Sequence, residues 1–376
     1  MIRILQTSDW QLGMNRQFLS EEAQERFRQA RFDSIRNIGL LAKEENCNLI
    51  LVCGDTFESN QVDRKTVARA LEILKDFTVP MYILPGNHDP LDAASVYRSS
   101  TFIDKKPAQV NVIENADIIS VADRVELVGA PWKSKRPVNN PLEDALDHLE
   151  PAGDIYRICL GHGAVDTFVP DTTAAGVISI TDLEKAIADH KVNFIALGDR
   201  HSMTQVGDTG CIWYSGTPES TGFRETDAGY LQIIDIDDGH LHQRAVRIGQ
   251  WKFVDRERVD LNSSADIETL EQWLRGIENK DRTAVRLTLV GSLTLTASSA
   301  LQHVLRDMDD VFASLEIDDD SLLIVPEDAD FENLGFSGFA DATVRELRNK
   351  MAEAGNESVV ASEALLLMIR LAKEPS

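Results

Sequence analysis

Cysteine is scarce in this sequence, and no two cysteines form a C-x-x-C pair. The four thiols, Cys47, Cys53, Cys159 and Cys211, are widely spaced along 376 residues. This spacing argues against a disulfide framework or a cysteine zinc site, so we expect reduced and mostly buried thiols. No apolar run approaches the roughly 18 residues that cross a bilayer, and the N-terminus lacks the features of a signal peptide. We therefore expect a soluble, cytoplasmic protein that does not associate with a membrane.

Basic residues are also scarce relative to acidic ones. The chain has 38 Lys and Arg against 62 Asp and Glu, which gives a formal net charge of −24. A protein that grips nucleic acid through its overall charge needs an excess of cations, because each phosphate contact depends on a local positive group. Any polyanionic substrate must therefore be attracted by metal ions, by a local basic patch or by a partner protein.

Short apolar runs alternate with amphipathic helical patterns up to about residue 250, which is typical of α/β architecture. We expect strands within residues 1–5, 47–55, 80–89, 124–130, 156–161, 192–198, 211–214 and 229–236, and helices at 20–46 and 63–77. A chain of this length usually holds more than one domain. We expect a large α/β domain at 1–250, a small α+β unit at 251–330 and a C-terminal helical segment at 331–376. The acidic stretch at 318–330 is interpreted as a solvated edge or linker.

Polar residues follow several of the expected strands. They are Asp9 and Gln11; Gly54 and Asp55; Gly86, Asn87, His88 and Asp89; Gly161 and His162; and Gly198, Asp199 and His201. The carboxyl ends of strands are where α/β proteins build their sites, because the sheet is rigid and the loops are free. A lone Gly-Asp is usually a turn, and a lone buried histidine is usually a core residue. The consecutive G-N-H-D, in contrast, is hard to explain by packing.

The ordered series D-x-Q, G-D, G-N-H-D, G-H and G-D-x-H resembles that of the calcineurin-like binuclear metallophosphoesterases, D-x-H, G-D, G-N-H-[DE], G-H and G-H-x-H. Its spacing, the form GDTFESN and the segment WYSGTPESTGFRETDAGYLQIIDID at 213–237 are most similar to SbcD-type DNA repair nucleases, which partner a Rad50-like ATPase. The resemblance covers residues 1–250. It implies a four-layer αββα sandwich with metals at one rim, then a small α+β capping domain and C-terminal helices.

The resemblance also implies two metal sites that share Asp55. One site contains Asp9, Gln11, Asp55 and His201, and the other contains Asp55, Asn87, His162 and Asp199. Two divalent ions about 3.5–4 Å apart would clamp a phosphoryl group and activate a water as hydroxide for in-line attack. His88 takes the place of the family's non-ligand histidine, which protonates the leaving oxygen or steadies the transition state. We expect Asp89 to accept a hydrogen bond from His88 and fix its tautomer.

Two positions depart from the family pattern. Gln11 stands where the first motif has histidine, and Asp199 stands where the fifth motif has its first histidine. A degenerate site would make the chain a pseudo-enzyme, whereas a retuned site would keep its ligand count and change its metal preference. We favour retuning, because both replacements retain an oxygen lone pair. An oxygen-rich site favours hard ions, with Mn²⁺ the best candidate, Mg²⁺ an alternative and Zn²⁺ less suited.

Four residues are candidates for substrate binding. Arg200 lies between two predicted ligands and could contact a phosphate, with an outward surface arginine as the alternative. Trp132 and Lys133 could stack on and anchor a nucleic-acid strand, with a packed tryptophan in a solvated loop as the alternative. Arg224, in STGFRE, is a further candidate of the same kind.

These features together predict a metal-dependent DNA nuclease in DNA repair or processing, an exonuclease or endonuclease acting on single- or double-stranded DNA. The alternatives are a phosphodiesterase or phosphatase for a small nucleotide, and a catalytically degenerate subunit of an ATPase–nuclease complex. A homodimer is compatible with the sequence. The apolar C-terminal residues could dock on a Rad50-like ATPase or pack on the chain's own core; they are Leu365, Leu366, Leu367, Ile369 and Leu371.

Overall fold

The computed structural model describes residues 2–174, 176–237, 240–325 and 338–351, together with 360, 361, 364, 365, 367 and 368. The chain forms two compact units, Met1–Phe253 and Val254–Ser376. Much of the helical segment expected at 331–376 lies outside the described residues. None of the helices in the described ranges is long and apolar enough to cross a membrane.

The first unit contains two six-stranded mixed sheets, as the α/β pattern predicted. The first sheet has the order β12-β11-β1-β2-β3-β4 and the second has the order β5-β6-β7-β8-β10-β9. The strands of the first sheet are β1 (Ile2–Thr7), β2 (Leu49–Cys53), β3 (Met81–Leu84), β4 (Val110–Val112), β11 (Tyr230–Asp237) and β12 (His240–Arg247). Those of the second are β5 (Ile119–Ala122), β6 (Val125–Gly129), β7 (Tyr156–His162), β8 (Phe194–Gly198), β9 (Thr204–Gln205) and β10 (Ile212–Tyr214).

Parallel strands form the centre of each sheet. β1 to β4 are parallel, and β11 and β12 add antiparallel strands at one side. In the second sheet β6, β7, β8 and β10 are parallel, and β5 and β9 are antiparallel at the edges. Because parallel neighbours end at the same edge, the residues after β1, β2 and β3 lie together, as do those after β7 and β8.

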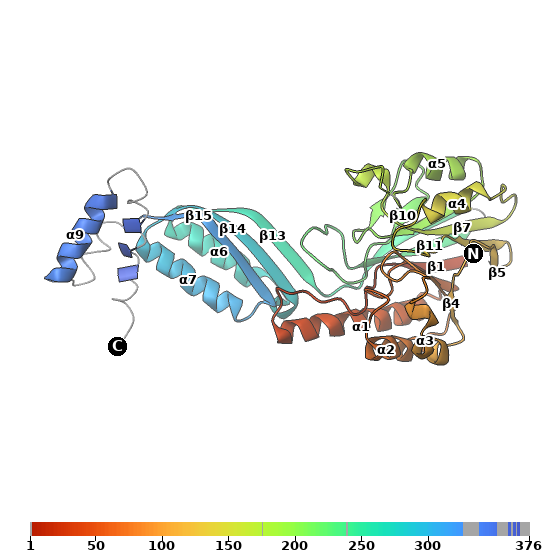
Figure 1. Cartoon of the computed structure of the whole chain (residues 1–376), viewed down its shortest axis with the longest axis horizontal. Coiled ribbons are helices and arrows are strands. Elements are labelled where there is room, and N and C mark those ends of the chain that lie inside the picture. Colours follow the sequence, from red (N-terminus) through yellow and green to blue (C-terminus); the bar gives the residue numbers. More distant parts are fainter. Residues whose placement is uncertain are drawn as a thin grey trace. The chain divides into compact units, whose positions relative to one another are not determined.

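Helices cover the outer faces of both sheets, which gives the expected four layers. The helices α1 (Glu21–Glu44), α2 (Arg64–Leu74) and α3 (Ser100–Lys105) lie on one side of this unit, and α4 (Pro141–Asp147) and α5 (Ile180–Ala188) lie on the other (Figure 1). Alternate side chains of each strand serve different layers. Ile4 and Leu51 pack between the sheets, whereas Leu5 and Ile50 pack against the helices. The αββα sandwich is therefore confirmed.

Two helices begin at the residues that the sequence indicated. The Ser20 hydroxyl accepts a hydrogen bond from the Ala23 N–H at the start of α1. The Asp63 carboxylate accepts from the Lys65 and Thr66 N–H groups at the start of α2. Such caps satisfy N–H groups that have no partner inside the helix. Both loops are thereby fixed where they leave the strand ends.

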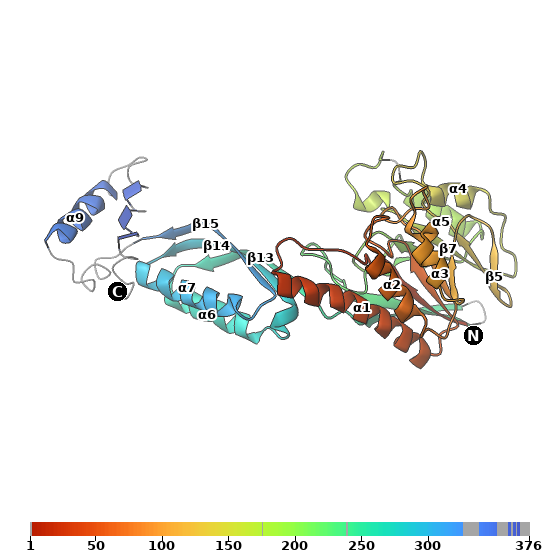
Figure 2. The same cartoon turned by 60° about the horizontal axis from the view of Figure 1, so that its bottom comes forward.

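The second unit is a small α+β structure. Its three strands, β13 (Lys252–Leu261), β14 (Thr283–Leu293) and β15 (Ser314–Ile324), form one sheet in that order. Two helices, α6 (Ser264–Gly276) and α7 (Leu295–Asp309), lie side by side along one face of it (Figure 2). The acidic stretch begins as exposed residues 318–320 of the edge strand β15, and its part at 326–330 lies outside the described residues. The remaining helices are η1 (Val96–Arg98), η2 (Asp166–Phe168), η3 (Lys280–Arg282) and α9 (Phe339–Met351).

The thiols match the expectation of reduced and mostly buried cysteines. Cys47, Cys53 and Cys159 are buried, Cys211 is half-buried, and all four are free. Burial raises the pKa of the Cys47 thiol to about 11 and that of the Cys159 thiol to about 12. A thiol that resists ionisation is a poor nucleophile and a poor metal ligand.

Candidate metal centre

The candidate metal centre lies where the carboxyl ends of strands from both sheets meet. Asp9, Asp55 and Asn87 follow β1, β2 and β3 of the first sheet, and His162, Asp199 and His201 lie at or after the ends of β7 and β8 of the second. Within the described residues, Asp9, Asp55 and His162 form a buried group whose ligand atoms all lie within 4.8 Å of one another. This group could hold a metal ion.

Two glycines allow the sheets to approach this closely. Gly54 has a φ of 96°, and a Cβ at that position would lie 2.0 Å from Nδ1 of His162. A Cβ at Gly198 would lie 1.8 Å from the Cys53 carbonyl oxygen, which cannot move without disrupting β2. No other residue type fits at these two points. The glycines of the two G-D motifs therefore bring the acids after β2 and β8 together.

The backbone is strained at the predicted ligands. Asp9, Gln11, Asp55 and Asp199 have φ values of 54°, 43°, 53° and 101°. Aspartate tolerates the left-handed region near 57°, but the value at Asp199 lies outside it. Hydrogen bonds hold part of this conformation: the Asp9 N–H donates to the Gly54 carbonyl at 3.0 Å, and the Gln11 N–H donates to the Asp55 carbonyl at 2.8 Å. Strain of this kind is concentrated at functional sites.

His162 faces a set of oxygen atoms that can only accept hydrogen bonds. Its Nδ1 donates to the Cys53 carbonyl at 2.8 Å, so that nitrogen carries a hydrogen. Its Nε2 lies 2.9 Å from Oδ1 of Asn87, 3.4 Å from Oδ1 of Asp55 and 3.8 Å from Oδ1 of Asp199. Lone pairs on all these atoms repel one another unless a positive charge lies among them. A bound cation or a protonated imidazole supplies that charge.

The pKa values show how strongly the carboxylates act on this ring. Burial alone would lower the pKa of His162, but Asp55, Asp9 and Asp199 together raise it well above its usual value. Burial raises the pKa of Asp9 to about 6 and also raises that of Asp199. For Asp55, burial favours a higher pKa, but the attraction of His162 and His88 outweighs burial and lowers it. The centre thus contains acids that need positive charge nearby.

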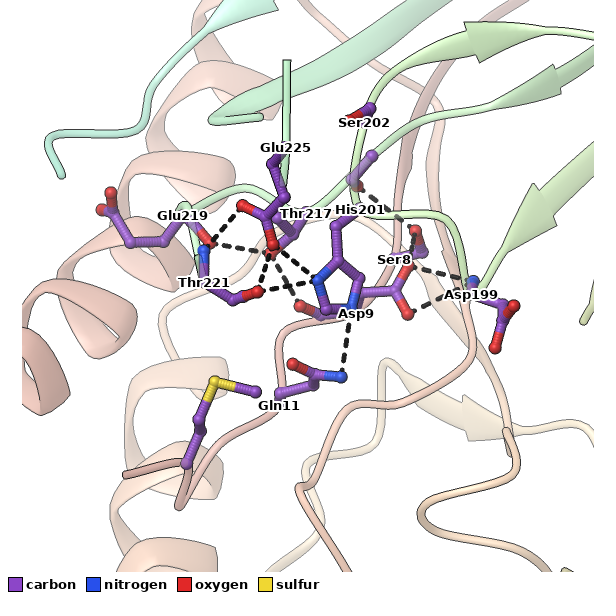
Figure 3. Close-up of polar contacts among 12 residues, drawn as sticks. Ser8, Asp9, Gln11, Asp199, His201, Ser202, Thr217, Glu219, Thr221 and Glu225 are labelled. Atoms are coloured by element: carbon purple, nitrogen blue, oxygen red, sulfur yellow. Dashed lines mark hydrogen bonds and ion pairs between the residues drawn. The ribbon is translucent and has the colours of Figure 1, made fainter. Parts of the chain in front are cut away.

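The other half of the centre is built around His201 (Figure 3). Its Nδ1 lies 2.7 Å from Oε1 of Glu225 and 2.8 Å from the Thr221 hydroxyl, and its Nε2 lies 3.2 Å from Nε2 of Gln11. Oε1 of Gln11 is buried and has no hydrogen-bond partner among the described residues. An unpaired buried carbonyl oxygen is costly, so this atom fits a role as a ligand.

Asp9 and Asp199 connect the two halves. Oδ2 of Asp9 accepts hydrogen bonds from the Ser8 hydroxyl at 2.6 Å and from the Asp199 N–H at 3.1 Å (Figure 3). Oδ1 of Asp199 is the oxygen that faces His162, at 3.8 Å. The structure thus places all seven predicted ligands around one rim, with Gln11 nearest His201 and Asn87 nearest His162.

His88 and Asp89 do not form the expected pair. The His88 N–H donates to Oδ1 of Asp55 at 3.0 Å, and its Nδ1 donates to the Glu58 carbonyl at 2.8 Å. Asp89 instead accepts from the Gly86 N–H at 2.8 Å, the Phe57 N–H at 3.0 Å and the Tyr97 hydroxyl at 2.6 Å. The prediction that Asp89 fixes the His88 tautomer is therefore wrong. The buried carboxylate binds backbone donors of its own turn, and the Glu58 carbonyl orients the imidazole.

Trp132 is not available as a stacking surface. Its side chain is 5% exposed, and its Nε1 donates to the His162 carbonyl at 2.7 Å. Its ring meets the His162 ring edge to face. The alternative of a packed tryptophan is therefore confirmed, and the prediction that Trp132 stacks on a nucleic acid is wrong, because the indole is buried against His162. Lys133 is exposed beside it, as expected for a solvated loop.

Arg200 and Arg224 border a cleft beside the centre. The cleft has a volume of about 330 Å³, and its lining includes Phe168, Asp199, Arg200, His201, Arg224 and Glu225. The Arg200 guanidinium lies 4.4 Å from the centre of the Phe168 ring, and its Nε donates to the Thr204 hydroxyl at 2.9 Å. Arg200 is thus a half-buried cation next to two candidate ligands.

Sequence reasoning missed the groups that orient the three histidines. Glu225 and Thr221 contact His201, and the carbonyls of Cys53 and Glu58 contact His162 and His88. Glu225 directly follows Arg224, a predicted substrate contact. A carboxylate in that loop was a detectable signal, whereas backbone carbonyls leave no trace in the residue types.

Comparison with family models identifies the family of this chain. The family model described as calcineurin-like phosphoesterase matches residues 2–203. The DNA double-strand break repair protein Mre11 of Archaeoglobus fulgidus is 24% identical over 262 residues, covering 64% of this chain and 56% of that protein. The chain thus matches little more than half the length of that relative.

Similar solved structures have low sequence identity. A dimetal phosphatase from Danio rerio is 11% identical to this chain, with a TM-score of 0.43. The matched region covers 65% of this chain and 95% of the phosphatase chain. The Thermus thermophilus protein TT1561 is 12% identical, with a TM-score of 0.41. The matched region covers 65% of this chain and 99% of TT1561. A 5'-nucleotidase precursor from the same organism is 13% identical, with a TM-score of 0.37. The matched region covers 66% of this chain and 54% of the precursor chain.

Proposed function

Because the chain belongs to the calcineurin-like phosphoesterase family, we propose that it is a nuclease that hydrolyses phosphodiester bonds of DNA with two divalent metal ions. The observation that carries the proposal is the convergence of oxygens from Asn87, Asp55 and Asp199 on Nε2 of His162, an arrangement that requires a positive charge and that a bound metal ion would satisfy. On the other side of the centre the NH₂ of Gln11 lies 3.2 Å from Nε2 of His201, and its Oε1 has no partner among the described residues.

We assign the ligands to two groups that share Asp55. Asp9, Gln11 and His201 would complete one group, and Asn87, His162 and Asp199 would complete the other. Each group then has one imidazole nitrogen and otherwise oxygen, which suits Mn²⁺ first, Mg²⁺ second and Zn²⁺ least. When bound, two such ions would polarise a phosphodiester and lower the pKa of an attacking water.

His88 is our candidate for the residue that assists the leaving oxygen. Its backbone N–H holds Asp55, and its Nδ1 donates to the Glu58 carbonyl, so Nε2 is the nitrogen left to exchange a proton. General acid catalysis by a positioned histidine typically contributes about 10²- to 10⁴-fold. Asp89 contributes by holding the turn that carries Asn87 and His88, and not by direct contact with His88.

A DNA substrate is supported by the similarity to an archaeal protein named for DNA double-strand break repair. The net charge of −24 means that local cations must hold the strand. Arg200 and Arg224 border the cleft beside the centre, and Lys133 is exposed beside Trp132. We infer that these cations contact phosphates and that a Rad50-like ATPase supplies further positive charge.

The C-terminal apolar residues give a mixed indication about such a partner. Leu365 is buried in a small cluster with Leu295 and Val344, which fits packing on the chain's own core. Leu367 is 56% exposed and could serve a partner. The other members, Leu366, Ile369 and Leu371, lie outside the described residues.

The test is cleavage of end-labelled single- and double-stranded DNA in Mn²⁺, Mg²⁺ or Zn²⁺, alongside a small chromogenic phosphodiester. We expect DNA cleavage that is strongest in Mn²⁺ and is lost in Asp55→Asn. Cleavage of the small diester or a cyclic nucleotide with no cleavage of DNA would identify a small-molecule phosphodiesterase. Absence of all cleavage, with less than one metal ion bound per chain, would identify a non-catalytic subunit.

A further inference from the structure

We propose that Glu225 is a positioning residue for the half of the metal centre formed by Gln11 and His201. The inference rests on the proposed metal-dependent function but concerns a residue that the motifs do not include. Glu225 lies in the loop between β10 and β11, and its side chain is 10% exposed. Its Oε1 lies 2.7 Å from Nδ1 of His201 (Figure 3).

Both carboxylate oxygens of Glu225 are occupied. Oε1 accepts from His201 Nδ1 and from the Thr221 hydroxyl, and Oε2 accepts from the Thr221 N–H at 2.7 Å. An ionised carboxylate can only accept hydrogen bonds, so Nδ1 of His201 must carry the hydrogen. Nε2 of His201 therefore presents its lone pair to the centre.

This tautomer also determines how Gln11 lies. The amide NH₂ of Gln11 donates to Nε2 of His201 at 3.2 Å, and Oε1 of Gln11 is left buried without a partner among the described residues. A cation held by the His201 lone pair would take the place of the Gln11 NH₂, and the amide would then have to turn for its Oε1 to face the ion. The contacts from Glu225 through His201 to Gln11 would thus hold two potential ligand atoms, Nε2 of His201 and Oε1 of Gln11, on this side of the centre.

The discriminating variant is Glu225→Gln, because an amide cannot reproduce both acceptor positions. If its oxygen keeps the Thr221 N–H, its NH₂ faces His201 and forces the hydrogen onto Nε2, which removes the lone pair from the centre. If its oxygen keeps His201, its NH₂ faces the Thr221 N–H, and that hydrogen bond is lost. Either arrangement weakens the Gln11 and His201 half.

Glu219→Gln is a matched control in the same loop. Glu219 is fully buried, and its Oε1 accepts from the Gln250 and Trp251 N–H groups while its Oε2 accepts from the Ser34 hydroxyl. An amide can keep the first two bonds with its oxygen and donate with its NH₂ to the Ser34 hydroxyl. The same chemical change is therefore tolerated at 219, and Glu219 does not contact His201 or Gln11.

The experiment measures Mn²⁺ binding by calorimetry and by electron paramagnetic resonance on the full chain. We expect two ions in the natural sequence, with the spectrum of a coupled pair. In Glu225→Gln one ion should bind about 10- to 100-fold more weakly, the size of effect typical for a residue that orients a metal-binding histidine. The spectrum should then change to that of an isolated ion, and Glu219→Gln should behave like the natural sequence.

NMR of the imidazole nitrogens in the metal-free protein gives a readout that a purely structural role would not change. We expect hydrogen on Nδ1 of His201 in the natural sequence and a shift of tautomer toward Nε2 in Glu225→Gln. Unchanged affinity for both ions in Glu225→Gln, or equal weakening of both, would overturn the proposal. If the natural sequence bound two ions but cleaved no DNA, the nuclease function would be refuted and the role of Glu225 would still stand.

Discussion

Nε2 of His162 lies 2.9 Å from Oδ1 of Asn87, while Nδ1 of the same ring donates to the Cys53 carbonyl. The two residues come from different sheets, and Trp132 holds the His162 backbone from behind. Both atoms present lone pairs when the imidazole is neutral, so a separation of 2.9 Å requires a positive charge at this point, either a proton on Nε2 or a bound cation.

Mn²⁺ should stabilise the natural sequence, and Asp55→Asn should remove most of this effect. In chelator we expect the variant to be less stable than the natural sequence, because the attraction of His162 and His88 outweighs burial and lowers the pKa of Asp55 in the folded chain. At 100 times the dissociation constant, a bound ion adds about 2.7 kcal/mol to the free energy of unfolding. Thermal unfolding of both proteins with and without Mn²⁺ measures this. If Mn²⁺ did not change the unfolding temperature of the natural sequence, a metal centre would be ruled out.

Substitutions at Gln11 should separate the two halves of the centre. Gln11→Ala removes the unpaired Oε1, so we expect one ion to bind more weakly while the ion near His162 binds normally. Gln11→His replaces the oxygen with an imidazole nitrogen and should broaden metal use toward Zn²⁺. Calorimetry with Mn²⁺ and Zn²⁺ on both variants tests this. If Gln11→Ala bound both ions as tightly as the natural sequence, Gln11 would not be a ligand.

The positions of the candidate ligands could be predicted because they depend on the strand ends. Apolar runs locate the strands, parallel pairing brings their carboxyl ends to one edge, and Gly54 and Gly198 allow the two sheets to approach closely there. These are properties of residue type and order. They predict the polar clusters at the strand ends, whereas the four-layer fold and the ligand set, which includes Asp9, Asp55 and His162, were implied by the resemblance of the motifs to those of the metallophosphoesterases.

The direction of individual side chains could not be predicted in the same way. Asp89 adjoins His88 in sequence, yet it turns inward because three buried donors of Gly86, Phe57 and Tyr97 need an acceptor. Trp132 lies next to a basic, exposed loop, yet its indole reaches the His162 carbonyl. Both outcomes depend on donors and acceptors that become neighbours only after the sheets have packed together.

His88→Ala should abolish most of the catalysis without loss of metal. The side chain is half-buried, and its ring donates a hydrogen bond to a backbone carbonyl, so the fold should tolerate its removal. We expect the turnover number to fall by about 10²- to 10⁴-fold and the Mn²⁺ stoichiometry to stay unchanged. Steady-state kinetics on a small phosphodiester and metal analysis of the same sample give both values. A loss of bound metal equal to the loss of rate would contradict the role assigned to His88.

Asp89→Ala should act through stability, in contrast to His88→Ala. It would leave the Gly86 N–H, the Phe57 N–H and the Tyr97 hydroxyl without their acceptor inside the protein. Each unsatisfied buried donor costs about 1–3 kcal/mol, although relief of the buried charge offsets part of this. We expect a clear loss of unfolding free energy in urea, larger than that of His88→Ala. Equal stability of the two variants would show that Asp89 does not hold the turn.

The buried carboxyl of Glu219 should make stability depend on pH. Burial is the main cause that raises the pKa of Glu219 above its ordinary value of 4.5, despite hydrogen bonds from Trp251, Gln250 and Ser34. The folded state therefore holds this proton more tightly than the unfolded state does. In the window from about 4.5 up to the raised pKa, the folded state binds more protons, so this group's contribution to stability falls as pH rises.

Glu219→Gln removes the ionisable group and keeps the hydrogen bonds, so it isolates the contribution of Glu219 to the pH dependence of stability. We expect the unfolding free energy of Glu219→Gln, relative to the natural sequence, to increase as pH rises through that window and then level off. For each unit by which the folded chain raises the pKa of Glu219, the unfolding free energy should differ by about 1.4 kcal/mol between the two ends of the window. Urea unfolding of both proteins at a series of pH values, in chelator so that metal binding does not contribute, measures the difference. Curves that stay parallel across the window would show that Glu219 ionises equally well in the folded and unfolded chain.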